Sequence, residues 1–213
     1  DAAYVQDSIE EEGTRFNGMY LRVNGVALWM RGANVIPMDE LEGRLSATGH
    51  RRLVRSALSG RMNMLRVWGG GMVLPKAFYD EADARGLLLY HDIMYAQGGH
   101  SPKVTQTQEN ELRHTVRKVS QHPSIVIWDV CNECQVQMNG PTSIYATFVL
   151  KVVAEEDKSR AIWPSSPASG WKSGVDRLTC RPTGNDLVTY ARDEIERTIE
   201  VHGNYIHGTG YPA

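Results

Sequence analysis

The sequence predicts an α/β protein built on a parallel sheet, because short apolar segments alternate with amphipathic ones. The alternation runs from residue 30 to residue 165. Within the apolar segments, apolar residues follow one another almost without interruption, which is typical of parallel strands covered on both faces. Two architectures fit this pattern, a (β/α)8 barrel and an open doubly wound sheet. No Gly-x-Gly-x-x-Gly opens the first unit, which disfavours the dinucleotide-binding form of the open sheet.

A β-hairpin precedes the alternating segments. Residues 20–23 and 26–30 are its expected strands, and Asn24-Gly25 between them is the strongest short turn signal. The residues before the hairpin are polar, so we expect a linker, or the tail of an upstream domain, over residues 1–19.

The strands and helices that follow are assigned from apolar spacing and from end signals. For example, one helix has Pro75 near its first turn and Gly86 just past its end. The pattern is lost from residue 166 to residue 198, where we expect a long loop. The predicted strands are 30–37, 62–68, 87–93, 124–130 and 161–165, and the predicted helices are 48–59, 75–85, 106–121 and 143–157.

Composition and charge narrow the possible partners. The chain has 213 residues, is 41% hydrophobic and carries a net charge of -2, so nothing favours a nucleic acid or an anionic membrane as partner. The most apolar helical stretch, residues 145–154, is too short to span a membrane and contains Lys151. The acidic residues 1–12 lack an apolar signal core, so the compartment stays open between lysosomal, secreted and cytoplasmic.

Polar side chains gather where the predicted strands end, and the carboxyl ends of parallel strands share one edge. Together these side chains could bind a sugar and cleave its glycosidic bond. An indole offers a flat apolar face for the sugar ring, carboxylates and amides bind its hydroxyls, and a Glu can protonate the leaving oxygen. Taken singly, each has a plainer explanation, such as a helix N-terminal acid for Glu133 or a core position for Trp68. The strand-end residues are Asn34, Arg66, Trp68, His91, Asp92, Asn132 and Glu133.

A lone Cys-x-x-Cys, formed by Cys131 and Cys134, opens an alternative from a different class of protein. It is compatible with a thiol-redox motif, or with half of a zinc site that Cys180 and His202 or His207 would complete. A structural zinc site usually shows two spaced pairs, and a second pair is missing from the sequence. The plain interpretation is two small half-buried thiols.

Five motifs, in this order and spacing, together resemble the catalytic barrel of glycoside hydrolase family 2, and within it the β-mannosidases. The Asn-Glu pair is shared by the whole family, whereas "LRVWGGG" is similar to the mannosidase branch. The β-galactosidase and β-glucuronidase branches are the alternatives. The motifs are "RGANVIPMD" (31–39), "MNMLRVWGGG" (62–71), "FYDEADARGLLLYHD" (78–92), "HPSIVIW" (122–128) and "NE" (132–133).

The resemblance implies a role for each matching residue. Glu133 is expected to be the general acid/base, and Asn132 the partner of the sugar 2-hydroxyl. No metal or cofactor is expected. The remaining expected contacts are Trp68 and Asp92 with the terminal sugar, Arg66 in support of the nucleophile, and Asn34 and His202 at the pocket wall.

The family resemblance also implies a retaining mechanism on a terminal, non-reducing β-linked mannose of an oligosaccharide. A second carboxylate, the nucleophile, belongs on strand seven of the barrel, roughly 90 residues after Glu133 and so beyond Ala213. A whole barrel needs about 250 residues, so we expect residues 20–213 to form a (β/α)8 barrel truncated after five or six strands. We therefore expect this chain alone to be inactive, and the parent to carry upstream β-sandwich domains and the rest of the barrel.

Overall fold

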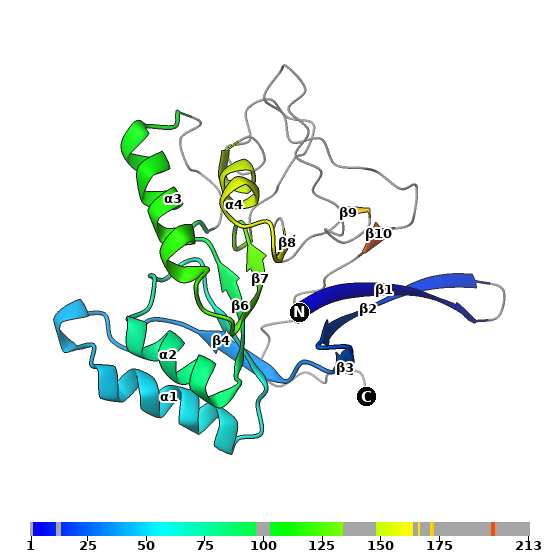
Figure 1. The fold of residues 1–213 in the computed structure, drawn as a ribbon, viewed down its shortest axis with the longest axis horizontal. Coiled ribbons are helices and arrows are strands. Elements are labelled where there is room, and N and C mark those ends of the chain that lie inside the picture. Colours follow the sequence, from blue (N-terminus) through cyan, green and yellow to red (C-terminus); the bar gives the residue numbers. More distant parts are fainter. Residues whose placement is uncertain are drawn as a thin grey trace, which may run out of the picture.

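A five-stranded parallel sheet is the centre of the fold. The computed structural model describes residues 2–11, 14–96, 103–133, 148–163, 166, 171–172 and 197–198. The strands stand side by side in the order in which the chain makes them (Figure 1). An open doubly wound sheet reverses its strand order at a switch point, whereas a barrel does not. The barrel prediction is therefore confirmed, with five strands described: β4 (Gly32–Val35), β5 (Met64–Val67), β6 (Leu88–Asp92), β7 (Ile125–Asp129) and β8 (Ala161–Trp163).

Helices connect successive strands, as the sequence predicts. The side-chain oxygen of Ser46 accepts a hydrogen bond from the Gly49 backbone N–H at 3.0 Å and so caps the first helix. Gly86 ends the second helix with a φ of 69°, which only glycine adopts at little cost. No helix in these described stretches is long and apolar enough to cross a membrane. The helices are α1 (Ala47–Ser59), α2 (Lys76–Arg85), α3 (Gln106–Val119) and α4 (Leu150–Glu156), with a 3-10 turn at Glu42–Arg44.

The predicted hairpin is present, and it starts earlier than expected. β2 (Thr14–Val23) and β3 (Val26–Leu28) flank Asn24 and Gly25, both of which have positive φ, as a type I′ turn requires. β1 (Ala2–Glu11) pairs antiparallel with β2, so residues expected to form a linker are in a strand. The tail of an upstream domain remains the other interpretation of residues 1–19.

The C-terminal part of the chain is described at only a few places. Two short strands, β9 (Trp171–Lys172) and β10 (Arg197–Thr198), pair antiparallel inside the segment expected to be a long loop. The first residues of the helix predicted over 143–157 lie outside the described part of the chain.

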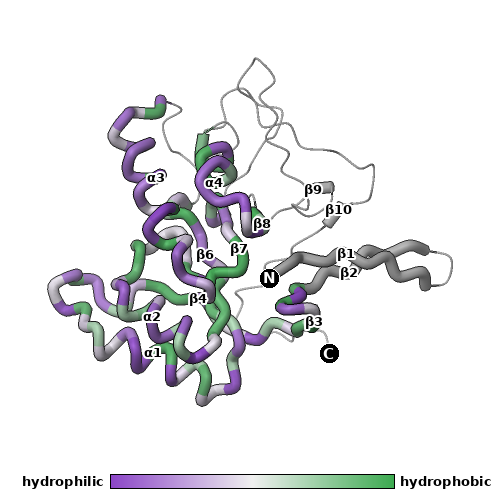
Figure 2. Tube along the Cα trace, viewed as in Figure 1, coloured by the Kyte–Doolittle hydropathy of each residue, from purple (hydrophilic) through white to green (hydrophobic). Residues whose placement is uncertain are grey.

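The outer face of the sheet packs against the helices and forms the main core. Alternate residues of each strand face outward, so Leu65 and Val67 of β5 are buried there while their neighbours Met64 and Arg66 face the other way. Figure 2 shows hydrophobic colour on the central strands and purple, hydrophilic residues along α1 and α3. The strand residues Leu89, Ile125, Trp128 and Ile162 and the helix residues Val54, Phe78, Val116 and Val153 complete the centre of this core.

A second, smaller cluster fills the inner face of the sheet near the start of its strands. Leu21 of the hairpin is only 6% exposed and packs with Val126 and Ile127 of β7. Met64 and Leu88, at the first positions of β5 and β6, are packed against the same cluster. The hairpin therefore covers the amino-terminal end of the barrel interior, which leaves the carboxyl end for polar residues.

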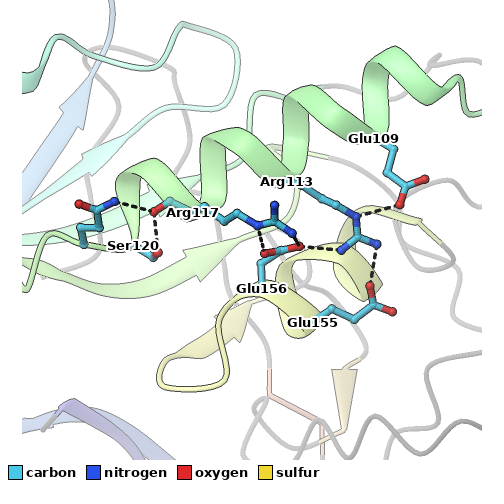
Figure 3. A network of polar contacts seen from close by, with 7 residues as sticks. Glu109, Arg113, Arg117, Ser120, Glu155 and Glu156 are labelled. Atoms are coloured by element: carbon cyan, nitrogen blue, oxygen red, sulfur yellow. Dashed lines mark hydrogen bonds and ion pairs between the residues drawn. The ribbon is translucent and has the colours of Figure 1, made fainter.

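An ion-pair network joins α3 to α4 on the outside of the barrel (Figure 3). The Arg113 guanidinium bonds Glu109 on its own helix and both Glu155 and Glu156 on α4, at 2.7 to 2.8 Å. Hydrogen bonds with these carboxylates raise the pKa of Arg113, and hydrogen bonding from Arg117 lowers the pKa of Glu156. The network fixes how α4 lies against α3, and α4 leads into β8.

A buried polar chain runs behind β6. The Leu74 N–H donates to the Tyr79 hydroxyl at 3.2 Å, and that hydroxyl lies 2.8 Å from Nε2 of His91. Nδ1 of His91 lies 2.7 Å from the Asp92 carbonyl oxygen, which only accepts, so Nδ1 carries the proton and Nε2 accepts from Tyr79. Burial lowers the pKa of the wholly buried His91 to about 4.

We predict that Leu89→Ala destabilises the protein by about 2–5 kcal/mol, because it empties a fully buried position between the sheet and the helices. Leu41→Ala is the matched control, since Leu41 is 61% exposed and its truncation should change the free energy of unfolding by less than about 0.5 kcal/mol. Urea denaturation of the intact protein measures both. Equal losses in the two variants would contradict this description of the core.

We also predict that stability falls with acid because of His91. Its pKa is about 4 in the fold against an ordinary value of 6.5, so between these values the unfolded chain binds a proton that the folded protein does not. The contribution of His91 to the free energy of unfolding therefore decreases as the pH falls from 6.5 through 4, by about 3 kcal/mol in all.

The pH series should be compared with that of His91→Gln, which cannot titrate and should lose this part of the pH dependence. His114→Gln, at an exposed position of α3, is the control and should keep it. An unchanged slope of unfolding free energy against pH in His91→Gln would refute the assignment.

Candidate active site

The carboxyl ends of β5, β6 and β7 bring charged side chains together inside the barrel. Arg66 stands in register with Tyr90, and Asp92 with Asp129. The second pairing depends on a β-bulge, because the register shifts by one residue between Leu89 and Tyr90. Without that shift Asp92 would stand beside Trp128, whose side chain faces the outer core.

Arg66 is the centre of this cluster. Its Nε and Nη2 atoms donate to Oδ1 and Oδ2 of Asp92 at 3.0 and 2.7 Å, and Nη2 also donates to Oδ1 of Asn132 at 2.9 Å. The guanidinium carbon lies 5.6 Å from the centre of the Tyr90 ring, within cation–π range. Burial by itself would lower the pKa of Arg66, but the hydrogen bonds and charge of Asp92, helped by Asp129, raise it.

Asp92 is fully buried and accepts three hydrogen bonds. Besides the two from Arg66, the Gly69 backbone N–H donates to its Oδ2 at 2.8 Å. These donors are arranged to stabilise an ionised carboxylate. Because the side chain has no exposed surface here, its direct effect is on Arg66, and a contact between Asp92 and a sugar stays a prediction.

The sequence analysis did not select Asp129 or Tyr90, yet both belong to the cluster. Asp129 is fully buried; its Oδ2 accepts from the Tyr90 hydroxyl at 3.0 Å and its Oδ1 from the Cys131 N–H at 3.2 Å. Burial raises its pKa well above the ordinary 3.8, and the nearby Asp92 carboxylate raises it further, against the opposing effect of Arg66. Nothing in a local pattern identifies Asp129, because its inward position follows from the bulge.

Backbone bonds hold Asn132 and Glu133 at the rim beyond the end of β7. The Asn132 N–H donates to the Tyr95 carbonyl at 3.0 Å, and the Glu133 N–H donates to the Ser166 carbonyl at 2.7 Å. Asn132 is 3% exposed, whereas Glu133 is exposed. Glu133 has a φ of 54°, a conformation that costs a non-glycine residue on the order of 1 kcal/mol and that is common at functional sites.

Trp68 lies half-buried one residue beyond β5. Its ring covers Gly70, where a Cβ atom would come within 2.1 Å of Cζ2 of the indole, so a larger residue at 70 would displace the ring. Gly69 is equally confined, since a Cβ there would meet the carbonyl oxygens of Ile93 and Tyr95 at 2.7 Å. The glycine run therefore lets the indole and the Asp92 carboxylate share one crowded rim.

The other expected site residues are placed less completely. Asn34 is exposed and in register with Arg66, at the same end of the sheet. His202 lies outside the described residues, as do the acidic residues Glu194, Glu196 and Glu200. The structure thus brings together Arg66, Asp92 and Asn132 by direct bonds, with Trp68, Glu133 and Asn34 on the same rim.

Cys131 differs from the expected free thiol. It is fully buried and disulfide-bonded, and Cys134 and Cys180 lie outside the described residues. A buried sulfur is shielded from the attacking thiolate that exchange requires, which disfavours a redox function. In the part of the chain that is described, no group of three His, Cys, Asp or Glu residues could hold a metal ion.

The arrangement combines one fixed cation with a fixed amide and an exposed acid. Because Arg66 has only donors, it holds the oxygen end of the Asn132 amide. An amide donor, an exposed carboxyl and an indole side by side on one rim suit the hydroxyls and the flat face of a sugar ring.

Comparison with known proteins agrees with this chemistry. Residues 76–193 match the TIM barrel domain of glycosyl hydrolases family 2. The β-mannosidase of Rattus norvegicus is 30% identical over 185 residues, covering 78% of this chain and 21% of that protein. β-Mannosidase B of Neosartorya fischeri is 33% identical over 191 residues, covering 79% and 22%. The chain thus spans about a fifth of the length of these relatives.

Comparison with solved structures also finds similarity to a β-mannosidase. The β-D-mannosidase of Dictyoglomus thermophilum superposes with a TM-score of 0.63 at 26% identity, over 78% of this chain and 22% of that one. A Bacteroides uniformis β-glucuronidase superposes with a TM-score of 0.52 at 16% identity, over 76% and 23%, which supports the fold alone. From the parallel barrel strands and the family match, the chain belongs to glycoside hydrolase family 2 and is part of its TIM barrel domain, with β-mannosidases among its relatives.

Proposed function

We propose that this barrel removes terminal, non-reducing β-D-mannose residues by a retaining, double-displacement mechanism. The proposal rests on one observation above all: Arg66 holds Asn132 directly beside Glu133 at the barrel rim. The similarity to β-mannosidases of animals and fungi supports β-mannose as the sugar.

In this proposal Glu133 is the general acid/base. It protonates the glycosidic oxygen while a second carboxylate attacks the anomeric carbon, and it then takes a proton from the water that releases mannose. The second carboxylate would come from a later strand of the barrel, so the chain described here supplies one half of the site. The exposure and backbone anchoring of Glu133 support its role, since a proton donor must reach the substrate from a fixed position.

The other rim residues bind and orient the sugar. The NH2 group of Asn132 donates to the 2-hydroxyl, Trp68 offers its indole face, and Asn34 lines the wall. Asp92 acts through Arg66, whose guanidinium it holds on two atoms. His202 is proposed as a further wall residue on the strength of the family resemblance.

We predict that Glu133→Gln in the intact protein lowers the turnover of a β-mannose oligosaccharide by about 10²–10⁴-fold with little change in sugar affinity. The loss should be much smaller for the first, bond-breaking step on aryl mannosides with good leaving groups, which need no proton. Steady-state kinetics on both substrates, with calorimetry for affinity, measures this.

Glu111→Gln is the matched control, because Glu111 is an exposed acid on the outer helix α3. Glu111→Gln should have the same turnover and sugar affinity as the unmodified protein.

Azide, a small nucleophile that needs no base, should restore turnover of an activated aryl mannoside by Glu133→Ala. Normal turnover of the oligosaccharide by Glu133→Gln would refute the role of Glu133.

A substrate panel tests the choice of sugar. We predict a higher kcat/KM for 4-nitrophenyl β-D-mannoside than for the corresponding β-galactoside and β-glucuronide, because the sugars differ in the hydroxyls and the carboxylate that the rim must accept. Preference for either of the other two glycosides would replace the proposed substrate with that of another family 2 branch.

A further inference from the structure

The cluster inside the barrel rim holds two fully buried carboxyl groups and one partly buried cation. Asp92 and Asp129 are both fully buried, and Arg66 is the only guanidinium or ammonium that the described residues place within ion-pair distance of either. If both acids were ionised, Asp129 would be a buried charge whose cation among the described residues is already bonded to Asp92, which is expensive away from water.

Hydrogen-bond geometry decides which of the two acids is ionised. Asp92 takes two short bonds from Arg66 and a third from the Gly69 N–H. Asp129 stands 3.6 Å from Nη2 of Arg66, which is an ion-pair distance but too long for a hydrogen bond. The carboxylate is therefore Asp92, and Asp129 is the group that retains a proton.

The contacts of Asp129 suit a neutral carboxylic acid. Its Oδ2 lies 3.0 Å from the Tyr90 hydroxyl oxygen, which donates to a carboxylate but, because a hydroxyl can also accept, becomes the acceptor when Oδ2 carries a proton. Its Oδ1 accepts the Cys131 N–H in either state. Among the described residues, the titratable and charged groups that face it are Arg66 from β5 and Tyr90 and Asp92 from β6, and burial with the Asp92 charge holds the pKa of Asp129 high.

The protonation state of Asp129 affects Asn132 through a shared atom. Nη2 of Arg66 has two N–H groups, and Asp92 and Asn132 take them at 2.7 and 2.9 Å. An ionised Asp129 would be a stronger acceptor than the neutral amide oxygen of Asn132 and would compete with it for the second N–H. A neutral Asp129 leaves that N–H to Asn132.

We propose that Asp129 is a positioning residue that works as a neutral carboxylic acid: by staying protonated beside Arg66, it keeps the guanidinium bonded to Asn132 and so fixes the amide that faces the sugar. The role in sugar binding rests on the proposed function, whereas the protonated state does not. No acid with this role was expected from the strand-end pattern, because Asp129 precedes the Asn-Glu pair by three residues.

Infrared spectroscopy tests the protonated state without any substrate. The intact protein, labelled with ¹³C at its Asp carboxyl groups, should show the carbonyl stretch of a protonated Asp at pH 7, separated by the label from any protonated Glu. Asp129→Asn should remove the band, and Asp80→Asn, a change at an exposed acid on α2, should keep it. Absence of the band at pH 7, or its survival in Asp129→Asn, overturns the proposal.

Sugar binding tests the positioning role. The variants are made on Glu133→Gln, which cannot turn over the probe, and methyl β-D-mannoside binding is measured by calorimetry. We expect Asp129→Ala to weaken binding at least tenfold and Asp129→Asn, a neutral isostere, to restore most of the affinity. A loss of more than tenfold in Asp129→Asn would show that an ionised group is needed and would overturn the proposal.

The two measurements separate the possible failures. If the sugar binds but the protonated Asp band is absent, the inference about Asp129 fails and the proposed function stands. If the band is present but methyl β-D-mannoside binds to none of the proteins, the protonated state stands, and the proposed sugar-binding function fails together with the positioning role.

Discussion

One partly buried guanidinium, that of Arg66, ties the ends of three adjacent strands together. It bonds Asp92 at the end of β6 and Asn132 beyond the end of β7, while its own backbone belongs to β5. A buried cation is stable only where acceptors surround it, so the strands must end in acids and amides at matching depth. The rim is therefore polar because the barrel holds the charge of Arg66 there. Glu133 is the exposed residue that follows Asn132, which Arg66 holds in place.

The rest of the fold places this cation and its partners. The hairpin residue Leu21 closes the opposite end of the interior with apolar contacts. The bulge in β7 turns Asp129 toward Asp92, Gly70 leaves room for the Trp68 ring, and Gly69 leaves room for the backbone of Ile93 and Tyr95. Since interiors are close-packed, a small change in any of these positions shifts the guanidinium. The chemistry of the rim thus depends on packing well away from it.

Short sequence motifs predicted the turns and helix ends, because these features depend mainly on residues that are adjacent in the chain. Asn24-Gly25, Pro75 and Gly86 predicted a turn, a helix start and a helix end, and the alternation of segments predicted the parallel sheet, whereas the barrel was expected from the family resemblance. Strand ends also identified Arg66, Asp92 and Asn132, which are bonded to one another. Asp129 and Tyr90 were missed because a one-residue register shift, set by pairing between distant segments, decides which side chains face inward. The strand of residues 2–11 was missed because its residues are largely polar, and the disulfide at Cys131 because a sequence does not give the pairing of its cysteines.

The most direct test of the whole account is a crystal structure of the intact protein carrying Glu133→Gln, with methyl β-D-mannoside bound. The account predicts the sugar ring against Trp68, the NH2 group of Asn132 at the 2-hydroxyl, residue 133 at the glycosidic oxygen, and Arg66 still bonded to both Asp92 and Asn132. A sugar bound elsewhere, or a side chain at 133 turned away from the glycosidic oxygen, would contradict it.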